Sequence, residues 1–571
     1  MQKRTLVLKG CIYIFFTTVL TACVGGGGDA ETAPESTPEV IPESTPESTP
    51  EVTNLWTKDE YLPSLKYKDM CKTPRLGKDV YGDAYEDKLG NWLDESFWLR
   101  SWTNETYLWY DEVEDKNPAL YNSPESYFET LKTFQKTITG QDKDKYHFTR
   151  STESFDQVAQ TGVSFSHGFN WVMHQSRPPR HATVSYVTPN SPASEAGFAR
   201  GDTFVKINEV DVKEGRDYVR LNDGFFPTDN DPTHTFTMQR INGTEYTVSM
   251  SGADLQEPPV FLTDTITAND EYGDPQSIAY VMLNTFNTFI AEKALFDTFK
   301  QLSTDGNNYD TLVLDLRYNS GGYIYIASQL GYMLSGNKLD PNAYFYKETQ
   351  NDKLDDAIPE PFYHYTSDYH EDLDAGQKIS SLNLEKVYVL TTSDSCSASE
   401  MLINSLRGAN IEVILIGGQT CGKPYGFYST DNCGTTYSTI QFKAENYKNF
   451  GDYADGFIPT LDPDELDSHD SYVEGCKVED DFEHALGDQQ ESLLSAAIHY
   501  HKYNECPVDK ENSQQTQGSA YSAFFTEKPT ANGDADLFND PRMKLHNNRG
   551  SNAIMLKNDN LNSNMSKPLT P

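Results

Sequence analysis

The sequence has few basic residues for its acidic content. Lysine and arginine together number 46 against 86 aspartates and glutamates, which gives a formal net charge of −40 over 571 residues. A nucleic-acid-binding protein needs a basic surface to displace counterions from phosphates. The composition therefore excludes nucleic acid as a partner. It suits an exported protein, although the charge by itself identifies no ligand.

Several short motifs with a specific chemistry are absent. The sequence has no C-x-x-C pair and no H-E-x-x-H, so neither a zinc knuckle nor a zinc peptidase helix is expected. It has no G-x-S-x-G, which argues against an α/β-hydrolase nucleophile elbow. We therefore expect no metal and no cofactor.

The apolar run near the N-terminus is too short to cross a bilayer. It covers Gly10–Ala22, follows three basic residues and closes in Leu-Thr-Ala-Cys23. These features are typical of a secretory signal over residues 1–23. The closing tetrapeptide resembles the bacterial lipobox, which implies that Cys23 is lipidated. Val24 then implies the outer membrane of a Gram-negative bacterium, facing the periplasm or the cell surface. The alternative is a plain secretory peptide with a chance cysteine.

Composition divides the rest of the chain. Residues 24–54 repeat Pro, Glu, Ser and Thr and predict an extended tether. Residues 55–150 contain DESFWLRSWTNETYLWYDEV, whose aromatic residues fall near helical spacing and indicate a small helical domain. Residues 509–571 are polar and predict a loosely attached tail.

Residues 151–254 alternate apolar and polar positions between turn signals, which predicts a β-rich domain. The stretch VSYVTPNSPASEAGFARGDTFVKINEVDV resembles a PDZ domain, with a short helix over Pro192–Ala196. PDZ domains add a peptide C-terminus as an extra strand and hold its carboxylate on backbone amides. The resemblance places that carboxylate loop at Gly162–Phe165, with Gly162, Val163 and Phe165 as peptide-binding residues. The alternative is a PDZ fold that only packs against its neighbour.

Residues 255–508 alternate strand and helix patterns, which favours an α/β domain with helices covering a sheet. The expected strands are Ile278–Met282, Thr311–Leu316, Val387–Thr391 and Ile411–Ile416. The expected helices are Phe289–Leu302, Tyr323–Leu334 and a helix that ends near Arg407.

Four serines fall within seven positions just before the helix that ends near Arg407, in TTSDSCSASE. Ser397 and Glu400 fit a capping box, so one interpretation is that Ser397 only caps the helix and has no catalytic role. The other interpretation makes Ser397 a nucleophile at a helix N-terminus. The glycine pair Gly321 and Gly322 follows another strand, and glycine amides at such a position stabilise a developing oxyanion. No histidine lies nearby in sequence, but Lys423 follows an apolar strand, and a buried lysine that is neutral can act as the base.

Three motifs in this order resemble those of the C-terminal-processing (tail-specific) serine peptidases. They are Leu314–Gly322 (LDLRYNSGG), Ser397–Glu400 (SASE) and Gly422–Lys423, and they follow a PDZ-like segment as in that family. The resemblance implies a ClpP/crotonase-like α/β fold for residues 255–508.

The resemblance also assigns roles to single residues. It implies Ser397 as the nucleophile and Lys423 as the base, with oxyanion donors from Gly321 or Gly322 and from Ala398. One departure is Phe427, which stands where many members have a glutamine that orients the lysine. Another is the spacing between serine and lysine, which is one residue longer than in the best-known members. An orienting partner is then expected elsewhere, for example Tyr425 or Thr420.

Six cysteines remain once Cys11 is removed with the signal and Cys23 is lipidated. An even number in an exported chain predicts disulfides, and six cysteines allow 15 pairings. Cys421 and Cys433 flank a Gly/Pro-rich segment and form the first expected pair.

The sequence as a whole predicts a membrane-tethered serine endopeptidase that cleaves proteins or peptides through a Ser–Lys dyad. The PDZ-like domain would recognise substrate C-termini or regulate access. The main alternative is a catalytically weak or inactive lipoprotein that binds protein C-termini, which Phe427 favours. A third hypothesis, a sugar- or peptidoglycan-binding module, is supported only by the aromatic content of the sequence.

Overall fold

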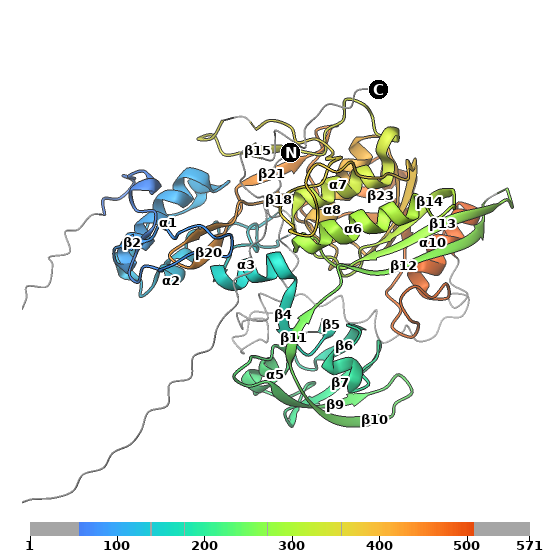
Figure 1. Ribbon diagram of the computed structural model, residues 1–571, viewed down its shortest axis with the longest axis horizontal. Coiled ribbons are helices and arrows are strands. Elements are labelled where there is room, and N and C mark those ends of the chain that lie inside the picture. The colour runs from blue at the N-terminus through green and yellow to red at the C-terminus, as the bar shows by residue number, and fades with distance from the viewer. Residues whose placement is uncertain (1–55, 138–139, 176, 271, 356, 508–571) are drawn as a thin grey trace, which may run out of the picture. The chain divides into compact units, whose positions relative to one another are not determined.

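The computed structural model describes residues 56–507, apart from 138–139, 176, 271 and 356 (Figure 1). The predicted signal peptide with Cys23, the tether and the polar tail lie outside the described residues. No helix within the described part of the chain is both long and apolar enough to cross a membrane.

The N-terminal region is built around one long helix, α1 (Trp92–Thr106). Asn91 and Asp94 form a capping box at its start. Its buried face carries Trp98 and Trp102, whose rings stack with their centres 5.2 Å apart. The prediction of a helix in the aromatic segment is confirmed. The remaining elements are short: η1 (Ser64–Lys66), β1 (Met70–Cys71), β2 (Lys88–Leu89), η2 (Tyr110–Glu112), η3 (Pro118–Leu120) and α2 (Pro124–Phe128).

The next region is β-rich, as predicted. Its main sheet has the order β10-β9-β7-β6-β5, with β8 paired to β7, and a separate antiparallel pair joins β4 to β11. The predicted short helix is present as α4 (Pro192–Glu195). The other elements are α3 (Thr152–Thr161), β4 (Val163–Ser166), β5 (Phe169–Gln175), β6 (His181–Val187), β7 (Thr203–Ile207), β8 (Val210–Asp211), α5 (Tyr218–Phe225), β9 (Thr233–Gln239), β10 (Glu245–Ser251) and β11 (Ala253–Gln256).

The C-terminal region contains a sheet of the order β12-β13-β14-β16-β17-β23-β22. Strand β12 is antiparallel to β13, and each of the other neighbouring pairs is parallel. The predicted strands are present. The bounds are β12 (Val260–Asn269), β13 (Pro275–Leu283), β14 (Tyr309–Asp315), β16 (Lys386–Thr391), β17 (Glu412–Gly417), β22 (Ile458–Thr460) and β23 (Tyr472–Lys477).

Helices cover both faces of this sheet (Figure 1). Alternate strand residues point to opposite faces. Leu312 and Leu314 of β14 therefore pack with α6, α7 and α8, whereas Val313 packs with α10. This explains why the strands read as continuous apolar runs. The helices are α6 (Phe289–Leu302), α7 (Ile324–Ser335), η4 (Gly336–Lys338), α8 (Ala398–Gly408), α9 (Pro463–Leu466) and α10 (Ser492–Tyr503).

Two small sheets complete the described chain. One has the order β15-β21-β18, with β15 (Lys347–Gln350), β18 (Tyr425–Gly426) and β21 (Phe442–Glu445). The other joins β19 (Thr430–Asn432) and β20 (Thr435–Ser438) to β3 (Phe148–Ser151). Tyr437 of β20 also packs against the aromatic face of α1. The segment that follows Lys423 therefore belongs to the same packed body as the N-terminal region.

Candidate active site

Three loops follow the carboxyl ends of adjacent parallel strands. Strands β14, β16 and β17 are neighbours, so the loops after Asp315, Thr391 and Gly417 meet at one edge of the sheet. These loops carry the predicted glycine pair, the serine cluster and Lys423, respectively. The structure thus brings all three parts of the predicted constellation to the same place.

Ser397 stands directly before α8 in a backbone conformation that non-glycine residues seldom adopt. Its φ is 59° and its ψ is −112°. The side chain is fully buried, and its Oγ forms no hydrogen bond with any described residue. The predicted capping box is made from the Glu400 side: the Ser397 N–H donates to Glu400 Oε2 at 3.0 Å. Strain and an unpaired buried hydroxyl are features of functional positions rather than of simple caps.

The neighbouring serines have structural roles. Ser395 Oγ donates to the Leu316 carbonyl at 2.8 Å, and Ser399 Oγ donates to the Asn319 carbonyl at 2.8 Å. Both hydroxyls therefore tie the serine loop to the loop that carries the glycine pair. Of these three serines, only Ser397 keeps an unpaired hydroxyl.

Lys423 is fully buried, and its Nζ has no hydrogen-bond partner among the described residues. The Nζ lies 4.7 Å from the ring centre of Tyr146 and 4.4 Å from that of Phe427. Burial lowers the pKa of Lys423 well below its usual range, while the charges of Asp144 and Glu400 act in the opposite direction. Neither Tyr425 nor Thr420 orients the amine by a hydrogen bond, because Nζ forms none.

Glu400 links the serine loop to the lysine loop. Its buried carboxylate accepts hydrogen bonds from the amides of Ser397, Gly422 and Lys423 and from the Thr420 hydroxyl. Burial raises the pKa of Glu400, and these hydrogen bonds oppose the rise. Sequence reasoning treated Glu400 only as a helix cap. Its position within Ser-Ala-Ser-Glu was the signal for the larger role.

A disulfide joins the same two loops. Cys396, next to Ser397, is bonded to Cys421, two residues before Lys423, with the Cα atoms 5.2 Å apart. The expected pair of Cys421 and Cys433 is therefore wrong, since Cys433 is bonded to Cys71 of the N-terminal region. Sequence proximity misled the prediction, because β19 and β20 carry Cys433 away to the N-terminal region. The third disulfide is Cys476–Cys506.

The glycine pair adopts conformations that require glycine, with φ of 111° at Gly321 and 139° at Gly322. A Cβ on Gly322 would lie 2.2 Å from the carbonyl carbon of Phe286. The amides of Gly321 and Gly322 differ in whether they are free to donate a hydrogen bond to an oxyanion. The Gly321 N–H donates to Asn319 Oδ1 at 2.9 Å, so Gly321 is not the free oxyanion donor. The amides of Gly322 and Ala398 donate to no acceptor in the described part of the chain.

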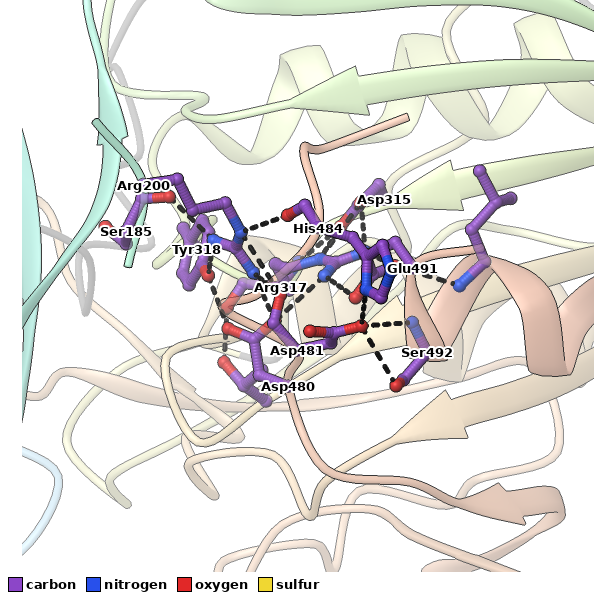
Figure 2. Close-up of polar contacts among 12 residues, drawn as sticks. Ser185, Arg200, Asp315, Arg317, Tyr318, Asp480, Asp481, His484, Glu491 and Ser492 are labelled. Carbon is purple, nitrogen blue, oxygen red and sulfur yellow. Dashed lines mark hydrogen bonds and ion pairs between the residues drawn. The ribbon is translucent and has the colours of Figure 1, made fainter. Parts of the chain in front are cut away.

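A buried ionic network holds the start of the glycine loop (Figure 2). Arg317 bonds to Asp315, to Asp480 at 2.9 Å and to Glu491 at 2.6 Å. Arg200, from the turn before β7, reaches the same cluster and donates to Asp480 at 2.7 Å and to the Tyr318 hydroxyl at 2.6 Å. Buried guanidinium groups that are paired with carboxylates hold a loop firmly, because breaking one ion pair leaves an uncompensated buried charge.

The predicted carboxylate loop of the β-rich region is not a loop. Gly162 ends α3 with φ of 62°, and Val163 and Phe165 lie in β4, paired with Gln256 and Asp254 of β11. This corrects the expected conformation of Gly162–Phe165. The main sheet ends in β10 on one side and in β5 on the other, and β5 pairs with β6 alone among the described strands.

Comparison with known proteins identifies the family of this constellation. Residues 277–447 match the model of peptidase family S41, and residues 96–149 match the model of the peptidase S41 N-terminal domain. Two segments of this chain are therefore similar to domains of peptidase family S41. The prediction of a C-terminal-processing peptidase family is confirmed.

Individual relatives are distant. The chain is 24% identical over 355 residues to carboxyl-terminal-processing peptidase 2 of Arabidopsis thaliana, a chloroplastic protein. That match covers 58% of this chain and 59% of the relative's length. Among solved structures, a Bacteroides fragilis protein assigned to the S41 proteases shares 24% identity with a TM-score of 0.49, covering 70% of this chain and 96% of that one. The photosystem II D1 C-terminal processing protease shares 17% identity with a TM-score of 0.39, and the match covers 64% of this chain and 91% of that one.

Proposed function

We propose that this S41 chain is a serine endopeptidase in which Ser397 is the nucleophile and Lys423 is the general base. The observation that carries the proposal is the pair of buried, unpaired groups, Ser397 Oγ and Lys423 Nζ, on loops that Glu400 and a disulfide hold together. Burial without a hydrogen-bond partner favours a neutral amine, and only a neutral amine can accept a proton.

The chemistry follows from the positions of these groups. Lys423 takes the proton from Ser397 as Oγ attacks the substrate carbonyl carbon, and it then gives that proton to the leaving amine. The amides of Gly322 and Ala398 stabilise the oxyanion. Water hydrolyses the resulting acyl-enzyme. Because both side chains are fully buried, substrate entry requires the site to open.

The deciding experiment compares the chain from residue 24 onward with its Ser397→Ala variant on fluorescein-labelled casein, an unfolded protein. We expect the parent protein to cleave casein and the variant to lose cleavage by roughly 10³-fold or more. Thermal unfolding serves as the control, since Ser397 Oγ makes no hydrogen bond whose loss would destabilise the fold. Equal cleavage by both proteins would refute the assignment of Ser397.

A catalytically inactive protein that binds C-termini is the second candidate. It is favoured by Phe427, whose ring centre lies 4.4 Å from Lys423 Nζ and which offers no amide to orient the amine. An inactive parent protein in the casein experiment would select this candidate. In either case, we propose that the region over residues 151–254 is PDZ-like and that lipidated Cys23 anchors the chain to the outer membrane.

A binding measurement tests the PDZ-like role. A peptide C-terminus could extend the main sheet along β5, one of its two end strands, which pairs only with β6 among those described. In the Ser397→Ala background, which prevents cleavage, peptides with a free apolar C-terminus should bind at least ~10-fold more tightly than their amidated forms, because amidation removes the carboxylate charge. Calorimetry measures both affinities. Equal affinities would show that any binding does not depend on C-terminal carboxylate recognition.

A further inference from the structure

The wall of the lysine site comes partly from the N-terminal region. Tyr146 precedes β3 and lies within the matched S41 N-terminal domain. Its ring lies 4.7 Å from Lys423 Nζ, and its hydroxyl donates to the carbonyl of Gly422 at 3.1 Å. Together with Phe427 it encloses the amine on two aromatic faces. Neither ring offers a conventional hydrogen-bond acceptor that could take a proton from an ammonium at this position.

Asp144 supplies the negative charge that the aromatic walls lack. Its side chain is fully buried. The carboxylate accepts hydrogen bonds from the Tyr107 hydroxyl at 2.7 Å and from the Tyr146 amide at 2.9 Å. Two fixed donors hold the carboxylate in place beside the residue that covers Lys423. The charges of Asp144 and Glu400 both raise the pKa of Lys423, against the larger effect of burial.

We propose that Asp144 is a positioning residue for the base, and that its carboxylate stabilises the ammonium that forms on Lys423 during acylation. The inference rests on the proposed Ser–Lys function. In that step the Ser397 O–H bond breaks, an N–H bond forms on Nζ, and Oγ bonds to the substrate carbonyl carbon. Burial raises the pKa of Asp144, while the hydrogen bonds from the Tyr107 hydroxyl and the Tyr146 amide oppose the rise and favour the carboxylate, which takes no proton in this step. The N-terminal region thereby contributes directly to the strength of the base, because a charge in a low-dielectric site acts strongly on its neighbour.

The other charged and titratable groups around this pair are few. Lys423 faces Asp144, Glu400 and Tyr146. Asp144 faces Tyr107, Tyr146, His147, Lys132, Tyr425 and Lys423. Burial raises the pKa of Tyr107 and Tyr146 and lowers the pKa of His147 to about 3, so all three stay neutral in the neutral range. Glu400 is unchanged when Asp144 is replaced, so the effect of Asp144 can be measured against a constant background.

The test is Asp144→Asn, which keeps the shape of the side chain and one of its two oxygen acceptors and removes the charge. Without Asp144 the ammonium form loses its partner, so the pKa of Lys423 falls further. We expect the rising limb of the pH–rate profile on labelled casein to move to lower pH by about one unit. The maximal rate should fall by roughly tenfold or more. A purely structural role would lower the amount of active protein without moving the midpoint of the limb.

A matched control is Asp115→Asn. Asp115 is also buried in the N-terminal region, where it pairs with Arg100 at 2.6 Å, and its charge is not among those that act on Lys423. This variant should unfold at a lower temperature and keep the midpoint of the parent protein. A midpoint that is unchanged or higher in Asp144→Asn would overturn the inference.

A second readout does not depend on turnover. In protein labelled with ¹³C at the lysine Cε, the Lys423 signal is assigned by its absence in Lys423→Met, and its titration gives the pKa directly. We expect a lower midpoint in Asp144→Asn than in the parent, and equal midpoints would refute the role of Asp144. Because this result is obtained even from a protein that cleaves nothing, failure of this inference and failure of the proposed function are distinguishable.

Discussion

Lys423→Met should abolish proteolysis while leaving the chain folded. Methionine fills a similar volume and removes the amine, so the expected loss on labelled casein is at least ~10³-fold. Lys423 Nζ is buried without a hydrogen bond, and an unpaired polar group in that position costs free energy. The melting temperature of Lys423→Met should therefore equal or exceed that of the parent. This combination separates loss of the base from loss of the fold.

Lys423→Arg should be inactive as well, because a guanidinium stays protonated at any working pH. In the parent, burial lowers the pKa of Lys423, and the amine is neutral above that lowered pKa. Activity should therefore rise with pH across the neutral to alkaline range and reach its plateau below the ordinary lysine pKa of about 10.4. Near-parental turnover by Lys423→Met would show that another group takes the proton from Ser397.

The central sheet could be predicted from the sequence because its signals are local. Val387–Thr391 and Ile411–Ile416 are short, mainly apolar runs, and both are strands within a residue of the expected bounds. The α6 helix has the predicted bounds, Phe289–Leu302. Parallel strands of an α/β domain present their carboxyl ends at one edge, so the order of the motifs was enough to predict that Ser397 and Lys423 approach each other.

Interactions between distant parts of the chain could not be predicted in this way. Cys71 and Cys433 are 362 residues apart, and no local pattern pairs them. Asp144 and Tyr146 reach Lys423 only because β3 pairs with β20 in the segment after the lysine. The expected carboxylate loop failed for a similar reason, since the partner of β4 is β11, at the far end of the β-rich region.

Removing the disulfide between Cys396 and Cys421 should lower both the stability and the activity of the protein. This disulfide closes a loop across 25 positions and joins the residue before the nucleophile to the loop that carries the base. All six cysteines that follow Cys23 are paired, so titration of the unfolded, unreduced protein should find no free thiol among them. Replacing Cys396 and Cys421 together by alanine should lower the free energy of unfolding by about 3 kcal/mol, because the unfolded chain gains freedom.

The same double variant should also lower kcat by roughly 100-fold, since a small displacement between nucleophile and base is enough for such a loss. Cys476 and Cys506 offer a matched control: their disulfide spans 30 positions and lies against α10, on the other face of the sheet from α8. Alanine at both of these positions should cost a similar free energy of unfolding, measured in urea, and leave kcat on labelled casein within about twofold of the parent. If both double variants lost activity to the same extent, the Cys396–Cys421 bond would contribute only to stability. Retention of full kcat without it would show that the hydrogen bonds to Glu400 and the bond from the Cys421 amide to the Ser395 carbonyl are enough to hold the two loops in register.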